Sequence, residues 1–154
     1  MSQDAPVLDP SRFDNSSLKF AIIASRFNDE LVGGLLKRTV ENLIQAGVPE
    51  ANLKIDRVPG SAELPYASQL RAREGIYDAV IALGVLIAGE TQHHDIISRT
   101  ASMGLQQVSL SENIPVINGV IAAENLEQAK DRTIGKLDRG KEFAEAAIEM
   151  AHWR

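Results

Sequence analysis

The feature that most constrains the fold of this chain is a fourfold alternation between short strand-like runs and longer segments with helical periodicity. The runs occupy residues 19–24, 53–58, 77–87 and 114–122; the second alternates apolar and polar residues, and the others are largely apolar. Short runs of this kind predict strands. Strands that alternate with helices predict a parallel sheet with right-handed crossovers and helices on both faces.

We therefore expect an α/β fold with a single three-layer α/β/α domain and a four-stranded parallel sheet of flavodoxin-like strand order. In the first helical segment, apolar residues recur at helical spacing from Leu35 to Ile44. Asp29 is expected to cap this helix, and Gly47 with Pro49 to end it. The helices are expected at residues 29–46, within 59–73, and at 91–110, 124–132 and 139–153.

Length and composition exclude several classes of protein. A chain of 154 residues fits one domain, and the polar segment 1–17 is expected to be a flexible N-terminal tail before a domain at 18–154. The absence of cysteine excludes disulfides and thiol catalysis, and the net charge of -5 argues against a nucleic-acid partner. No apolar run is long enough to span a membrane, and no secretory leader is visible, so we expect a cytoplasmic protein.

Four loops are expected to carry the chemistry. Ligands of open parallel sheets bind at the carboxyl ends of the strands. The segments that follow the predicted strands there are 25–29, 58–65, 84–94 and 118–125. They should gather at one edge of the sheet.

The third loop places Gly89, Glu90 and Thr91 between a strand and a helix. Backbone N–H groups at a helix N-terminus form a natural phosphate site, to which the Thr91 hydroxyl could add a donor. A plain turn capped by Thr91 is an equally good interpretation. The Glu90 carboxylate would repel phosphate, so its side chain must face away if the loop binds an anion.

His93 and His94 follow directly. Neighbouring residues on a helix point about 100° apart, so at most one of the two should face the crevice. Helical metal ligands sit three or four residues apart, so this pair argues against a metal site, and we expect none. Two interpretations remain for the pair: a proton-transfer group in the crevice, or solvent-exposed side chains.

Three other loop or helix residues have both a structural and a functional interpretation. Phe27 could pack within the protein or lie over a flat heterocycle. Glu63 could be an acid favoured by the helix dipole or an acceptor for ligand hydroxyls. Arg132 could be a cation at the C-terminal end of a helix or a clamp for phosphate.

Taken together, these motifs resemble the lumazine synthase family. The resemblance rests on five ordered segments that cover most of the chain from residue 19 to residue 150. They are SRFN at 25–28, VPGSAELP at 58–65, ALGVLIAGETQHHDI at 82–96, NGVIAAENLEQAKDR at 118–132 and RGKEFAEAAIEM at 139–150.

The resemblance implies a transferase of riboflavin biosynthesis that acts without a cofactor. It would condense 5-amino-6-(D-ribitylamino)uracil with 3,4-dihydroxy-2-butanone 4-phosphate, releasing phosphate and water. His93 would be the acid/base, and Glu90, Thr91 and Arg132 would bind phosphate. The ribitylaminouracil would contact Phe27, Ser61, Ala62, Glu63, Val85, Leu86, Ile87 and, from a neighbouring subunit, Asn118. His94 is expected to point elsewhere on the helix.

The resemblance also implies partners. Besides the two small-molecule substrates, these are further copies of the chain, in a homopentamer or a 60-subunit icosahedral shell, and it raises riboflavin synthase as another. The sequence departs from the family pattern at Ala88, Asn118, the turn 138–140 and the spacing between Arg132 and Gly140. These departures leave open a non-catalytic relative that binds flavin or lumazine, or a shell protein.

Overall fold

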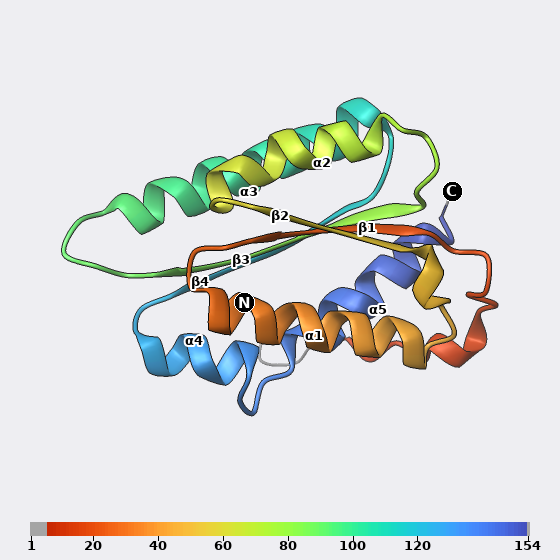
Figure 1. The fold of residues 1–154 in the computed structure, drawn as a ribbon, viewed down its shortest axis with the longest axis horizontal. Coiled ribbons are helices and arrows are strands. Elements are labelled where there is room, and N and C mark those ends of the chain that lie inside the picture. Colours follow the sequence, from red (N-terminus) through yellow and green to blue (C-terminus); the bar gives the residue numbers. More distant parts are fainter. Residues whose placement is uncertain (1–5, 154) are drawn as a thin grey trace.

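The computed structural model describes residues 6–153 and has a four-stranded, fully parallel sheet in the order β2-β1-β3-β4. Helices α2 and α3 cover one face, and α1, α4 and α5 cover the other (Figure 1). The predicted α/β class, strand number and strand order are confirmed. The strands are β1 Phe20–Ser25, β2 Leu53–Val58, β3 Ala79–Ile87 and β4 Val116–Ala123. The α-helices are α1 Asp29–Gln45, α2 Leu64–Ala72, α3 His93–Glu112, α4 Leu126–Thr133 and α5 Arg139–Ala151.

Alternation along β1 divides the core into two halves. Phe20, Ile22 and Ala24 face α1 and α5, whereas Ala21 and Ile23 face α2 and α3. All five side chains are fully buried. A strand that is apolar on both faces is the form expected between two helix layers.

The strand order places the crevice beside β1. In the sheet, β2 lies on one side of β1, and β3 and β4 lie on the other side, so the strand order reverses at β1. In open α/β sheets, ligands bind at the carboxyl ends of the strands where the order reverses in this way. The loops after β1 and β3 are therefore the ones best placed to form a site.

Part of the segment predicted to be a tail contacts the domain. Asn15 is only 2% exposed, and its Nδ2 donates to Ala46 O at 2.8 Å and to Pro10 O at 3.1 Å. Its Oδ1 lies 2.9 Å from His152 Nε2, and Phe13 stacks on the same imidazole at 4.5 Å between ring centroids. Residues 1–5 lie outside the described part of the chain, and the flexibility of the segment stays a prediction.

Within residues 6–153, no helix combines the length and the apolar character needed to cross a membrane.

Candidate active site

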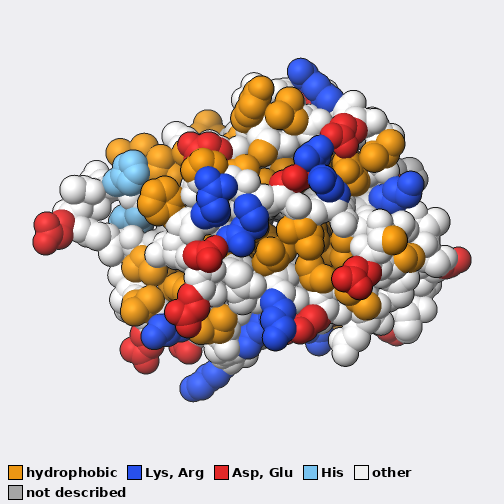
Figure 2. All heavy atoms as spheres, viewed as in Figure 1, with side chains coloured by type: hydrophobic (Ala, Val, Ile, Leu, Met, Phe, Trp, Pro, Cys, Tyr) orange, Lys and Arg blue, Asp and Glu red, His pale blue; other side chains and the backbone are white. Residues whose placement is uncertain are grey.

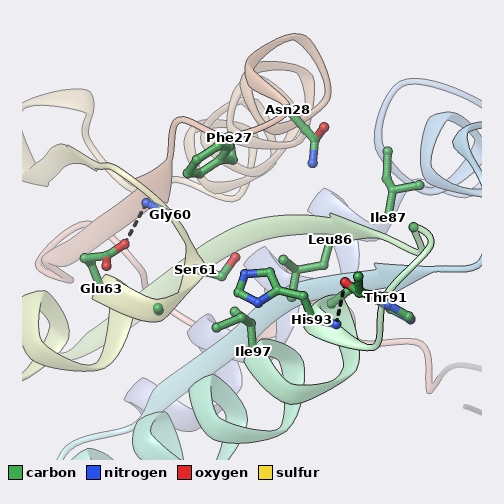
Figure 3. Close-up of a pocket in the computed structure, with 13 residues that line it drawn as sticks. Phe27, Asn28, Gly60, Ser61, Glu63, Leu86, Ile87, Thr91, His93 and Ile97 are labelled. Carbon is green, nitrogen blue, oxygen red and sulfur yellow. Dashed lines mark hydrogen bonds between the residues drawn. The ribbon is translucent and has the colours of Figure 1, made fainter.

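A cavity of about 520 Å³ opens at the carboxyl edge of the sheet (Figure 3). The loop after β1 contributes two of its lining residues, and the segment after β2 contributes Gly60 to Glu63. The end of β3, its loop and the first turns of α3 form the remaining wall. The lining residues are Phe27, Asn28, Gly60, Ser61, Ala62, Glu63, Leu86, Ile87, Gly89, Thr91, His93, His94 and Ile97. Three of the four predicted loops thus meet at one cavity.

The end of β3 offers backbone groups on the side where β1 has stopped. Pairing between β1 and β3 ends at Leu83, whereas pairing with β4 continues to Ile87. The Val85 carbonyl accepts from Asn28 Nδ2 at 2.8 Å, and the Ala88 N–H donates to Ala123 O on the other side at 2.9 Å. Because successive residues of a strand direct their backbone groups to opposite neighbours, the N–H and C=O of Ile87 face the β1 side. Leu86 instead lines the cavity with its side chain.

Asn28 sets the turn between β1 and α1. It adopts the left-handed conformation, with φ at 58°, which asparagine tolerates better than most residues. Its side chain bonds to Val85 O and does not cap α1. The predicted cap at Asp29 is wrong, because Asp29 is the first helical residue and its carboxylate accepts from Arg57 Nη2 at 2.5 Å.

Phe27 and Glu63 are held against the backbone of Gly60. A Cβ added at residue 60 would lie 3.0 Å from Phe27 Cδ2 and 3.3 Å from Glu63 Oε2, so the Phe27 ring rests on this glycine. The Gly60 N–H donates to Glu63 Oε2 at 2.9 Å. Phe27 is nevertheless 69% exposed, which leaves aromatic surface accessible at the cavity.

Ser61 forms the floor between these residues and β3. It is 4% exposed, and its hydroxyl is the nearest atom to the position that a Cβ on Gly84 would occupy. The buried Ser25 Oγ lies beside the same glycine and has no hydrogen-bond partner among the described residues. The absence of a side chain at residue 84 therefore lets the turn after β2 lie directly on the sheet.

The loop before α3 combines the two interpretations drawn from the sequence. Thr91 Oγ1 accepts from the His93 N–H at 3.3 Å, as a plain turn requires, and the threonine also lines the cavity. A hydroxyl that accepts one bond still has a proton to donate. Glu90 is exposed and is not among the cavity-lining residues.

Both histidines border the cavity. Figure 3 shows the His93 imidazole beside Ile97, on the side of Ser61, and His94 is also a lining residue. The prediction that His94 points away from the crevice is wrong. The helix begins at His93, two residues later than expected. The cavity therefore lies over the N-terminal end of α3 as well as along one side of it. A side chain about 100° round the axis can therefore still reach it. Figure 2 shows imidazoles beside hydrophobic side chains at the end of the molecule where α3 begins.

Val85, a predicted contact of the pyrimidine, is fully buried and is not among the residues that line the cavity. Two further predicted site residues lie elsewhere in this chain. Asn118, in β4, is exposed; its Nδ2 donates to Ser102 Oγ at 2.9 Å, and its Oδ1 accepts from the Val120 N–H at 3.1 Å. Arg132, in the last turn of α4, donates from Nη1 to Gln128 O at 3.2 Å. Neither is among the residues that line the cavity.

Sequence reasoning gave no role to Asn28, Gly60 or Ile97, although all three line the cavity. A signal existed for two of them. An asparagine between a strand and a helix is typical of a left-handed turn, and Ile97 lies one helical turn after His93.

The fold and the cavity define the class: a doubly wound α/β domain with a ligand-sized site at the carboxyl edge of its sheet. Comparison with known proteins gives the family. The family model described as 6,7-dimethyl-8-ribityllumazine synthase matches residues 17–154. A protein of that name from Pyrococcus furiosus is 45% identical over 140 residues, which are 91% of this chain and 87% of that protein. Another from Paracidovorax citrulli is 38% identical over 141 residues, covering 92% of this chain and 90% of that protein. The chain belongs to the 6,7-dimethyl-8-ribityllumazine synthase family, and the resemblance seen in its motifs is confirmed.

Proposed function

We propose that this chain catalyses the condensation of 5-amino-6-(D-ribitylamino)uracil with 3,4-dihydroxy-2-butanone 4-phosphate. The products are 6,7-dimethyl-8-ribityllumazine, phosphate and water, and the step is the penultimate one of riboflavin biosynthesis. The observation that carries this proposal, together with family membership, is one cavity that joins an exposed aromatic ring to an imidazole at a helix N-terminus.

The wall formed by the loops after β1 and β2 suits the ribitylaminouracil. The exposed Phe27 ring offers a face for the flat pyrimidine. The backbone groups of Ile87, on the side where β1 has ended, offer hydrogen bonds to its edge. The second carboxylate oxygen of Glu63, with Ser61 and Ala62, offers polar groups for the ribityl hydroxyls.

The start of α3 suits the phosphate of the second substrate. Gly89 and Thr91 border the cavity ahead of the helix N-terminus, where backbone N–H groups and the helix dipole favour an anion. The Thr91 hydroxyl can donate to a phosphate oxygen while accepting from the His93 N–H. We assign Glu90 a backbone contact only, because its side chain is exposed outside the lining.

His93 is the proposed acid/base. The amine of the pyrimidine adds to the ketone with loss of water, phosphate leaves, and the ring closes with loss of a second water, so protons must be moved at each stage. An imidazole can both accept and donate a proton. Holding the two substrates in one cavity supplies further rate through proximity.

We further propose that Asn118 and Arg132 act in the cavity of a neighbouring subunit of a homopentamer, with a 60-subunit shell as a further assembly. Both residues lie off the cavity of their own chain, which supports a second copy as the source of these two side chains. The same proposal includes a cytoplasmic location and contact with riboflavin synthase.

The shared site can be tested by complementation. The His93→Gln and Arg132→Ala variants are each expected to have strongly reduced activity alone. Mixed under conditions that allow subunit exchange, they should regain activity, because some contacts then pair an intact His93 with an intact Arg132. A mixture no more active than its components, despite exchange shown by mass spectrometry, would place Arg132 in its own subunit's site or outside catalysis.

The reaction itself is tested by mixing the purified protein with both substrates and following lumazine fluorescence. Turnover well above the uncatalysed rate is expected. Tight binding of the pyrimidine without turnover would instead support a non-catalytic relative.

A further inference from the structure

The cavity contains little positive charge of its own. Among its lining residues, which all lie in the described part of the chain, no lysine or arginine is present, and Glu63 contributes a carboxylate. The side chains of the lining that can carry positive charge are the imidazoles of His93 and His94. A substrate that bears a phosphate dianion therefore meets the N-terminus of α3 and these two rings.

The two rings are not equivalent. The His93 side chain is exposed within the cavity, whereas His94 is half-buried at the second position of α3. Its Nδ1 is buried and has no hydrogen-bond partner among the described residues. His94 lines the cavity and its Nδ1 is buried, so we infer that Nε2 is the ring nitrogen available to a ligand.

We propose that His94 is a substrate-binding residue whose Nε2–H donates to the phosphate of the second substrate. His93 is then free to move protons. This division rests on the proposed function, and it assigns His94 to affinity for one substrate and not to the rate of the chemical steps. A hydrogen bond from a nitrogen to an anionic oxygen is stronger than one between neutral groups.

The experiment compares His94→Phe, which keeps a ring of similar size without nitrogen, with His94→Gln, which retains an N–H donor. Asp95→Asn is the matched control, because Asp95 is exposed in the same turn, lies outside the cavity lining and pairs with the exposed Arg99 at 3.1 Å. The KM of each substrate and kcat are measured, together with the affinity for inorganic phosphate by calorimetry.

His94→Phe should raise the KM for the phosphate-bearing substrate about tenfold and weaken phosphate binding by a similar factor, as expected for the loss of one charge-assisted hydrogen bond. The KM for the pyrimidine should stay unchanged. His94→Gln should lose less affinity than His94→Phe, and Asp95→Asn should match the wild type.

Unchanged phosphate affinity and KM in a folded His94→Phe variant would overturn the assignment, while turnover by the wild type would leave the proposed function intact. A loss of kcat without any change in KM in the His94→Gln variant would also overturn the assignment of His94. If the wild type binds phosphate through His94 but never forms lumazine, the proposed function fails and the assignment of His94 stands.

Discussion

Replacing Gly84 with alanine tests whether the turn after β2 rests directly on the sheet. A Cβ at residue 84 would overlap Ser61 Oγ, far inside the 3.0 Å below which real Cβ contacts essentially never fall. Its next neighbours, Ser25 Oγ at 3.3 Å and Leu64 Cδ1 at 3.4 Å, are close but tolerable. The Ser61 hydroxyl must therefore leave this position, either by rotating about χ1 or by a shift of the turn Ser61–Glu63.

The expected cost follows from this geometry. Forcing an extra methyl into a packed site costs about 1–3 kcal/mol, and replacing glycine within a strand returns roughly 0.5–1 kcal/mol of backbone entropy. A net loss of about 1–2 kcal/mol in the free energy of unfolding is expected for Gly84→Ala. In a Ser61→Ala background the overlapped oxygen is gone, and the entropic gain offsets the remaining close contacts with Ser25 and Leu64, so the cost of the same substitution should fall to near zero.

The assay is urea unfolding of the wild type, both single variants and the double variant, followed by circular dichroism at one protein concentration. The entropic gain is the same in both backgrounds and cancels in the double-mutant cycle. A coupling energy of about 1–2 kcal/mol is expected between Gly84→Ala and Ser61→Ala. A coupling within roughly 0.5 kcal/mol of zero would refute the packing argument, because independent sites give that result.

Three further predictions concern catalysis, the N-terminal segment and a carboxyl group of α5. His93→Gln should lower kcat by about 10²–10⁴-fold with little change in either KM, measured by lumazine fluorescence; an unchanged kcat would exclude it as the acid/base. Asn15→Ala should lower the free energy of unfolding by about 1–3 kcal/mol, because Ala46 O and His152 Nε2 lose their buried partner; urea unfolding equal to that of the wild type would contradict this. Burial raises the pKa of the Glu145 carboxyl above 4.5, so the folded state favours its proton and loses stability as pH rises through that pKa. Glu145→Gln should therefore be more stable than the wild type at pH 7 but not at pH 3, and the opposite order in urea unfolding would be inconsistent with a raised pKa.

The strands could be predicted closely because their signals are local. β2 has the predicted bounds, and β1 lies one residue further along than the predicted run. The first residues of the helices were harder to predict, because they depend on the local turn that precedes each helix and on the polar groups that bond to its free N–H groups. α3 begins two residues later than expected, after a turn in which the Thr91 hydroxyl accepts from His93. The predicted cap at Asp29 failed because the left-handed Asn28 precedes α1, so Asp29 is already the first helical residue, and its carboxylate pairs with Arg57.

The cavity could be predicted as far as strand order determines it. Phe27, Ser61, Glu63, Thr91 and His93 meet because their loops leave neighbouring parallel strands at one edge. Angles around a helix axis were a poorer guide. The argument that neighbouring residues point about 100° apart holds for a ligand that lies along one side of a helix. A ligand placed over the N-terminus of α3 can contact both His93 and His94.

Asn118 and Arg132 mark the limit of what one chain can reveal. β4 is an edge strand, and it has α3 on one face of the sheet and α4 on the other (Figure 1). Asn118 bonds to α3, and Arg132 lies on α4, so the two residues are on either side of this edge. A second subunit that packed along the β4 edge would contact Asn118 and Arg132 together. Within one chain, neither residue lines the cavity. The sequence motif can therefore imply a role for these residues without indicating which copy of the chain they serve.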